Sequence, residues 1–304
     1  MNSTVGHTAT ETSAAGAWLR ALRLHHWSKN LFVFVPLLLG HAYSDVAKLA
    51  ASAAAFLLLG LLVSAGYVIN DVVDIEADRQ HKSKQHRPFA SGRLSPRAGI
   101  AVAAVLTAAA FAGAAFLSRG FAAVLVAYFL LTVLYSIWLK SVALIDVAAI
   151  ATMLTLRIAA GGAVIGTGQS AWLLSFSGAF FLSLALAKRH GEVMQAALAA
   201  PGPIAGRGFR SEDWPLTLAF GVGAGLASII IMLLYLANDA APSGFYPHQG
   251  WLYAVPGVVL IWLMRVWVLS HRRELHDDPV IFALKDPASL ALGVVAAAAF
   301  TLAL

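Results

Sequence analysis

Nine long apolar stretches constrain the fold of this chain more than any other feature of its sequence. A helix of roughly 20 apolar residues crosses the ~30 Å hydrocarbon layer of a bilayer. The chain is 60% hydrophobic and only 12% charged, whereas soluble domains carry roughly 25% charged residues. The stretches predict membrane-spanning helices over residues 19–41, 46–70, 96–117, 121–139, 143–163, 171–189, 214–237, 250–270 and 287–303.

These stretches predict an all-α polytopic membrane protein with about nine transmembrane helices. Residues 17–304 are expected to form a single transmembrane domain. Residues 1–16 are small and polar and lack the basic and apolar regions of a signal peptide, so we expect a disordered N-terminal tail. The chain has no cysteine, which excludes disulfides, thiolate metal ligands and a cysteine nucleophile.

The distribution of basic residues predicts the orientation in the membrane. With the N-terminus in the cytoplasm, seventeen of the 21 Lys and Arg residues lie on the cytoplasmic side. The three long polar connections, residues 71–95, 190–213 and 271–286, then face the cytoplasm together. Because the net charge of +6 is concentrated there, we expect a cytoplasmic active site and no nucleic-acid partner.

A cluster of carboxylates ends the second apolar stretch. Asp71, Asp74, Glu76 and Asp78 fall within eight residues, and ionisable groups at the edge of a membrane are costly enough to indicate function. On a continuous helix Asp71, Asp74 and Asp78 share one face, while Glu76 points elsewhere. Three carboxylates without cysteine suit Mg²⁺, which prefers oxygen ligands and bridges to phosphates.

Basic residues follow the carboxylates directly. Arg79, Lys82, Lys84 and Arg87 can neutralise phosphate oxygens beside a bound metal. This combination suits the departure of a diphosphate, because metal and cations share its developing charge. The basic residues alone are also what a cytoplasmic loop would carry.

Three further groups are candidates for substrate binding. The segment LALAKRHGEV carries Lys188, Arg189 and Glu192 at the end of the sixth stretch, and LRLHHWSKN carries Lys29 and Asn30 near Trp27, an expected interface anchor. Asp146 lies near the start of the fifth stretch. Arg157 is about 16 Å deeper on the same face, where it could pair with a buried carboxylate or hold a phosphate. Asp277, Asp278, Lys285 and Asp286 could line the site, but a solvated loop is the favoured interpretation.

The pattern N-D-x-x-D-x-x-x-D over Asn70–Asp78 resembles the first motif of the UbiA superfamily of intramembrane prenyltransferases. The number of apolar stretches and the position of the motif agree with that family. The resemblance implies a UbiA-like helical bundle in which Asn70, Asp71, Asp74 and Asp78 bind Mg²⁺ and a diphosphate. The second aspartate motif of the aromatic prenyltransferases, D-x-x-x-D, has no counterpart near Lys188.

Further segments look like one branch of this family, the decaprenyl-phosphate phosphoribosyltransferases: W-x-K-N at Trp27, Y-S-x-x-L-K with Tyr135 and Lys140, and A-K-R-x-x-E at Lys188. That resemblance implies phosphoribosyl pyrophosphate as donor, polyprenyl phosphate as acceptor, a bacterial-type plasma membrane, and Asp146 as a catalytic residue near the ribose. One alternative is prenyl transfer to an aromatic or other small acceptor. Another is a transporter or lipid-binding protein without chemistry. The oligomeric state stays open.

Overall fold

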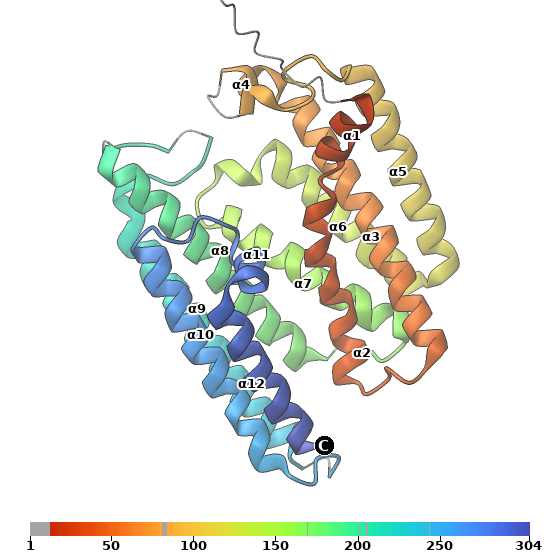
Figure 1. Cartoon of the computed structure of the whole chain (residues 1–304), viewed down its shortest axis with the longest axis vertical. Helices are drawn as coiled ribbons and strands as arrows, with labels where there is room; N and C mark the ends of the chain where they lie inside the picture. The colour runs from red at the N-terminus through yellow and green to blue at the C-terminus, as the bar shows by residue number, and fades with distance from the viewer. Residues whose placement is uncertain (1–12, 81–83, 169, 200, 205, 243) are drawn as a thin grey trace, which may run out of the picture.

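The chain folds as a bundle of long helices (Figure 1). The structure, a computed structural model, describes residues 13–304 except residues 81–83, 169, 200, 205 and 243. In these residues no strand forms, and seven helices are long and apolar enough to cross a membrane. They are α3 (Val46–Val73), α5 (Pro96–Leu117), α6 (Arg119–Ile137), α7 (Ile145–Ile165), α8 (Ala171–Ala199), α9 (Trp214–Tyr235) and α10 (Ala254–His271). The prediction of an all-α membrane protein is confirmed.

The first predicted span is interrupted, and the last is preceded by a sharp bend. The first divides into α1 (Ala14–Leu22), the 3₁₀-helix η1 (Leu24–Phe34) and α2 (Val35–Leu39), because Arg23 adopts a left-handed conformation with φ 50° and Pro36, in the first turn of α2, has no N–H to bond back into η1. The last, predicted over residues 287–303, forms α12 (Pro287–Ala303), and the short helix α11 (Pro279–Lys285) in the preceding connection meets it at 83°; the two make an eighth span if counted together. The nine-span prediction is therefore approximate.

The N-terminal boundary differs from the expected one. Ser13 accepts a hydrogen bond from the backbone of Gly16, so α1 begins at Ala14 rather than at residue 17. Residues 1–12 lie outside the described part of the chain. Short elements complete the connections: α4 (Ile75–Arg79), η2 (Lys84–His86), η3 (Leu139–Ser141), η4 (Ser211–Asp213), the π-turn η5 (Leu236–Ala240) and η6 (Gln249–Tyr253).

Helix α7 lies at the centre of the bundle and contributes to two apolar clusters. Val147, Ala151 and Leu154 pack with side chains of α8, α9 and α10. Ala160 packs with side chains of α3, α5 and α6. Because α7 has neighbours on both sides, polar groups on it are shielded from lipid, and both Asp146 and Arg157 are buried.

The 3₁₀-helix η1 sorts its side chains onto three faces. Residues three apart eclipse one another in a 3₁₀-helix, and runs longer than three or four residues are uncommon. In this eleven-residue run, Trp27, Asn30 and Val33 turn into the bundle. Close packing fixes the run, since a Cβ on Gly60 would clash with the Trp27 ring and one on Gly161 with the Val33 carbonyl. The predicted interface anchor Trp27 thus packs inside the bundle and donates a hydrogen bond to Ser64.

Helix α3 is longer than a bilayer requires. Its 28 residues extend about 42 Å, compared with the ~30 Å hydrocarbon layer. Its last turns therefore stand at or beyond the edge of the hydrocarbon, and they carry Asn70 and Asp71.

Candidate active site

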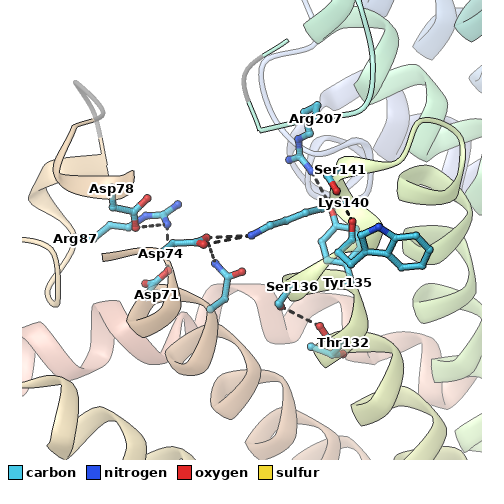
Figure 2. Close-up of polar contacts among 12 residues, drawn as sticks. Asp71, Asp74, Asp78, Arg87, Thr132, Tyr135, Ser136, Lys140, Ser141 and Arg207 are labelled. Atoms are coloured by element: carbon cyan, nitrogen blue, oxygen red, sulfur yellow. Dashed lines mark hydrogen bonds and ion pairs between the residues drawn. The ribbon is translucent and has the colours of Figure 1, made fainter. Parts of the chain in front are cut away.

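The end of α3 carries two buried carboxylates and one half-buried carboxylate. Helix α3 stops at Val73 because Asp74 leaves the helical conformation, with ψ 8°, and α4 starts one residue later. Asp71 and Asp78 are buried, and Arg87 lies between them at 3.2 Å and 2.7 Å. Asp74 turns away towards Lys140, which reaches across from η3 at 3.3 Å (Figure 2).

The three carboxylates do not converge on one point as a continuous helix face would require. Within the described residues, no three Asp, Glu or His side chains lie close enough together to hold a metal ion. Each carboxylate is instead bound to a basic side chain, and Asn70 Nδ2 donates to Asp74 at 3.0 Å. The break at Asp74 is the physical reason for this difference. Glu76 is exposed, as predicted from its position on the helix.

The basic residues after α3 have different surroundings. Arg87 is central, because it bridges Asp71 and Asp78. Arg79 points outward, where it pairs with Glu76 and donates to the Ala90 carbonyl. Lys84 is exposed, and Lys82 lies outside the described residues. Of the three candidates that the structure describes, Arg87 is the one that lies against Asp71 and Asp78.

Arg23 belongs to this site although the motif gives no indication of it. Its guanidinium donates twice to Asp71, at 2.7 Å and 3.0 Å, and lies over the Tyr67 ring at 4.8 Å. Bidentate pairs of this kind are strong and directional. The left-handed backbone at Arg23 separates α1 from η1. A basic residue just before the W-x-K-N segment was the available signal.

A second charged group lies where α7 and α8 meet, around Asp146. This carboxylate is fully buried. It lies 2.7 Å from Arg189 Nη2 and 3.3 Å from Arg207 Nη1, and the Tyr135 hydroxyl donates to it at 2.9 Å. Arg189 also pairs with Glu192 on the next turn of α8. Asp146 therefore holds two guanidinium groups in place.

Arg207 is a site residue that lies in the long connection after α8, among the cations that the sequence predicts to be cytoplasmic. It donates to the Tyr135 hydroxyl at 3.0 Å, as Figure 2 shows. Burial lowers its pKa, but Tyr135 and Asp146 outweigh burial and the pKa lies above its usual value. Arg207 is therefore charged at every physiological pH.

Lys188 and Arg189, adjacent in sequence, belong to different groups. Arg189 is buried against Asp146, whereas Lys188 is about half exposed and lies 3.8 Å from Asp278. Lys29 donates to the same carboxylate at 2.7 Å. Burial raises the pKa of Asp278, but Lys29 and Lys188 lower it by more than burial raises it, so the pKa lies below its usual value.

Asp278 corrects the expectation of a wholly solvated loop at residues 277–286. Asp277 is half exposed and pairs with Lys285, as expected. Asp278 instead caps α11, accepts from the Val280 backbone at 3.1 Å and faces the two lysines. Asp286 caps α12 and pairs with Arg265 of α10.

Arg157 lies inside the bundle with neutral partners. Its guanidinium donates to Asn30 Oδ1 at 3.1 Å, to the Tyr128 hydroxyl at 2.8 Å and to the Met153 carbonyl at 2.6 Å. Asp146 is not among its partners, although both lie on one side of α7. Of the two roles predicted for Arg157, pairing with a buried carboxylate is not seen in the described residues.

Together these groups form a polar region with two ends. The end of α3 offers carboxylates that hold positive charge and can exchange it for a metal. The region around Asp146, Asp278 and Arg157 offers guanidinium and ammonium groups that can bind phosphate oxygens. Such an arrangement can bind an anionic, metal-associated substrate at the edge of the membrane.

Relatives in sequence agree with this fold and site. The profile of the UbiA prenyltransferase family matches residues 12–285. An uncharacterized protein of Sinorhizobium fredii, y4nM, is 47% identical over 94% of the chain, and the chain spans 56% of that protein's length. The nodulation protein NoeC of Azorhizobium caulinodans is 31% identical over 91% of the chain and 92% of its own length. The decaprenyl-phosphate phosphoribosyltransferase of Mycobacterium tuberculosis is 32% identical over 58% of the chain and 59% of its own length.

The fold also matches solved structures. A UbiA homologue from Archaeoglobus fulgidus bound to DMAPP and Mg²⁺ superimposes with a TM-score of 0.68, covering 94% of this chain and 97% of the homologue at 14% identity. The chain belongs to the UbiA prenyltransferase family, and its apolar helices are those of an integral membrane protein.

Proposed function

We propose that this chain transfers 5-phosphoribose from phosphoribosyl pyrophosphate to a polyprenyl phosphate and releases pyrophosphate at the cytoplasmic membrane face. The proposal rests on the charged side chains near the end of α8. Arg189 and Arg207 surround one buried carboxylate there, where a second diphosphate–metal site would need several acids. These cations suit a donor that carries a further phosphate besides its diphosphate. The resemblance to decaprenyl-phosphate phosphoribosyltransferases over 58% of the chain supports the same assignment.

The residues at the end of α3 fit Mg²⁺ by their chemistry. Asp71, Asp74, Asp78 and the Asn70 amide supply only oxygen ligands, which this ion prefers. Each carboxylate already holds a positive group, so the position favours a cation. When bound, Mg²⁺ would neutralise charge that develops on the departing pyrophosphate.

Basic side chains around the carboxylates would take up the remaining negative charge. Arg23, Arg87 and Lys140 lie within 3.3 Å of these carboxylates. With a cation held by the carboxylates, the three side chains would be free to bind pyrophosphate oxygens. Charge-assisted hydrogen bonds to an anion are the strong ones, and they would strengthen as the leaving group departs.

The group around Asp146 would orient the donor. Arg189 and Arg207 suit the 5-phosphate, with the partly exposed Glu192 at the rim. Asp146 is completely buried and has three partners. This environment favours a positioning role through the two guanidinium groups over the direct contact with the ribose that the sequence resemblance implies.

The acceptor needs no strong base, because a phosphate monoester is largely ionised at neutral pH. Its oxygen attacks C1 of the ribose while the bond from C1 to pyrophosphate breaks. Attack opposite the leaving group inverts C1, so an α-linked donor gives a β-linked product. Prenyl transfer to a small acceptor, the second candidate, is supported by the DMAPP-bound homologue of the same fold.

A transfer assay tests the proposal. Purified protein in lipid is incubated with Mg²⁺, polyprenyl phosphate and phosphoribosyl pyrophosphate labelled in the ribose. We expect label in the lipid phase and a β-configured product by NMR. Labelled lipid that is α-linked would contradict single displacement. An inactive mixture, together with prenylation of an aromatic acid from an isoprenoid diphosphate, would move the assignment to the second candidate.

A further inference from the structure

A polar centre made of Asn30, Tyr128 and Arg157 lies inside the bundle, where η1, α6 and α7 meet. The side chains of Asn30 and Arg157 are 0% and 6% exposed. Arg157 donates to Asn30 and Tyr128 and lies 4.9 Å from the centre of the Tyr128 ring. This centre is separate from the carboxylates at the end of α3, which have their own cations.

The positive charge of Arg157 has no carboxylate partner in the described residues. Burying an unpaired charge is costly, and arginines inside a membrane normally pair. Arg265, which lies in the membrane-spanning helix α10, follows that rule, with two hydrogen bonds to Asp286 at 2.8 Å and 3.0 Å. The contrast indicates that Arg157 is retained to bind an anion that is not part of the chain.

Hydrogen-bond donors at this centre remain available. A guanidinium has five N–H donors, and Arg157 uses three of them among the described residues. Because Asn30 Oδ1 accepts from Arg157, the amide nitrogen is the free end, and this buried Nδ2 has no partner in the described chain. Buried donors without acceptors are rare, so the missing group is an acceptor.

The surrounding charges specify how negative that acceptor is. At the end of α3, three carboxylates face three cations, and around Asp146 two carboxylates face two cations. Near Arg157, Lys29 and Lys188 share the single carboxylate of Asp278. Three cations with one carboxylate leave two positive charges, and a phosphate monoester carries about −1.5 to −2 at pH 7.

An apolar cavity of about 410 Å³ is lined in part by residues that are close in sequence to Asn30 and Arg157. Phe32, two residues after Asn30, and Ile158, next to Arg157, both line it, together with Pro36, Phe180, Tyr235 and Phe300. Pockets of 300–1,000 Å³ enclose molecules of drug size. The cavity can therefore take the first part of a long apolar tail whose anionic head lies at Arg157.

We propose that Asn30 and Arg157 form the subsite for the phosphate of the acceptor lipid, with its apolar tail entering the cavity beside Phe32 and Ile158. The assignment to an acceptor rests on the proposed transferase function; the binding of a lipid phosphate does not. The 5-phosphate of the donor is the other source of a phosphate monoester, and the test separates the two.

Binding is measured without turnover, on the full chain in detergent, with polyprenyl phosphate, the matching polyprenol and ribose 5-phosphate as probes. We expect wild type to prefer the phosphate over the alcohol by at least about tenfold, as for a charge-assisted hydrogen bond of 1.5 kcal/mol or more. Arg157→Gln should lose this preference, and Arg157→Lys should keep part of it. Ribose 5-phosphate should not displace the lipid.

Two controls make the result decisive. Arg265→Gln removes a paired arginine, and Asp74→Asn changes the α3 carboxylates; both should keep the preference for the phosphate. An unchanged preference in Arg157→Gln, or in Arg157→Lys and Asn30→Ala if the first variant does not fold, overturns the subsite. Displacement of the lipid phosphate by ribose 5-phosphate overturns its assignment to the lipid. A preference that depends on Arg157 in a protein without phosphoribosyl transfer would refute the proposed function and leave the subsite standing.

Discussion

Helices α3 and α8 are both longer than a bilayer span requires, and charged side chains are arranged in opposite ways at their ends. At the end of α3, Asp71, Asp74 and Asp78 are the fixed groups, and Arg23, Arg87 and Lys140 come to them from other elements. At α8, Arg189 belongs to the helix itself and shares the buried Asp146 with Arg207. A site made of carboxylates can exchange its cations for a metal, whereas a site made of guanidinium groups around one acid holds anions. In the proposed reaction the two ends would therefore bind different parts of one substrate.

The largest expected effect concerns the α3 end. Asp74→Asn removes one charge from the proposed metal site and should lower transfer activity by about 10²–10³-fold, as losses of preorganised electrostatic stabilisation do. Glu76→Gln is the matched control, because Glu76 lies two residues away, is exposed and pairs with Arg79. Its activity should stay within a few-fold of wild type. Rates at saturating Mg²⁺, with far-UV circular dichroism of both variants, check this; equal losses would remove the distinction between the two acids.

At the end of α8, we expect substitutions to lower the free energy of unfolding more clearly than the rate of transfer. Arg189→Ala leaves Asp146 buried with one fewer cation, and breaking such a pair costs about 3–5 kcal/mol. Arg207 remains beside Asp146, so the lower part of that range is expected. Arg79→Ala, which breaks the exposed pair with Glu76, should cost about 0–1 kcal/mol. Thermal unfolding in detergent compares them; an undestabilised Arg189→Ala would contradict the buried network.

Lys140 connects the two ends, since it extends from the α6–α7 connection to Asp74. Lys140→Met should weaken donor binding about tenfold, because a hydrogen bond to a charged group is worth roughly 1.5–3 kcal/mol. The same change should strengthen Mg²⁺ binding in the absence of donor, because the ammonium no longer competes for Asp74. Titration calorimetry with and without pyrophosphate measures both. If Lys140→Met changed the affinities for pyrophosphate and for Mg²⁺ in the same direction, the proposed replacement of the Lys140 ammonium by Mg²⁺ at Asp74 would be excluded.

The smallest effect is in the pH profile. The acceptor phosphate loses its second proton near pH 6, so the rate should rise through that region and then stay flat. Asp278, whose pKa lies below its usual value, contributes stability that is complete above about pH 4 and is lost only as the pH falls through its lowered folded pKa. It should add no transition between pH 5 and 8. A further inflection there, absent in Asp278→Asn, would contradict the environment of this carboxylate.

The sequence predicted the fold class and the position of the α3 site because both depend on local signals. The length of the apolar stretches defines the spans, and the spacing of Asp71, Asp74 and Asp78 defines a motif. The shared helix face was not realised, because the helix breaks at Asp74, which a periodicity argument does not detect. Arg23 and Arg207 were not predicted as site residues, and a solvated loop was favoured for Asp278, since tertiary packing brings these residues to partners 48 to 249 positions away. Arg157 was found by its depth in an apolar stretch, but its neutral partners required the structure.

Metal binding tests the difference between the two ends most directly. Mn²⁺ replaces Mg²⁺ in a titration followed by electron paramagnetic resonance, with pyrophosphate present, on wild type, Asp74→Asn and Glu192→Gln. Glu192 is the partly exposed acid of the α8 end, which makes it the counterpart of Asp74. The account predicts that Asp74→Asn loses tight Mn²⁺ binding and that Glu192→Gln retains it. Retention by Asp74→Asn together with loss in Glu192→Gln would place the metal at α8 and contradict the account.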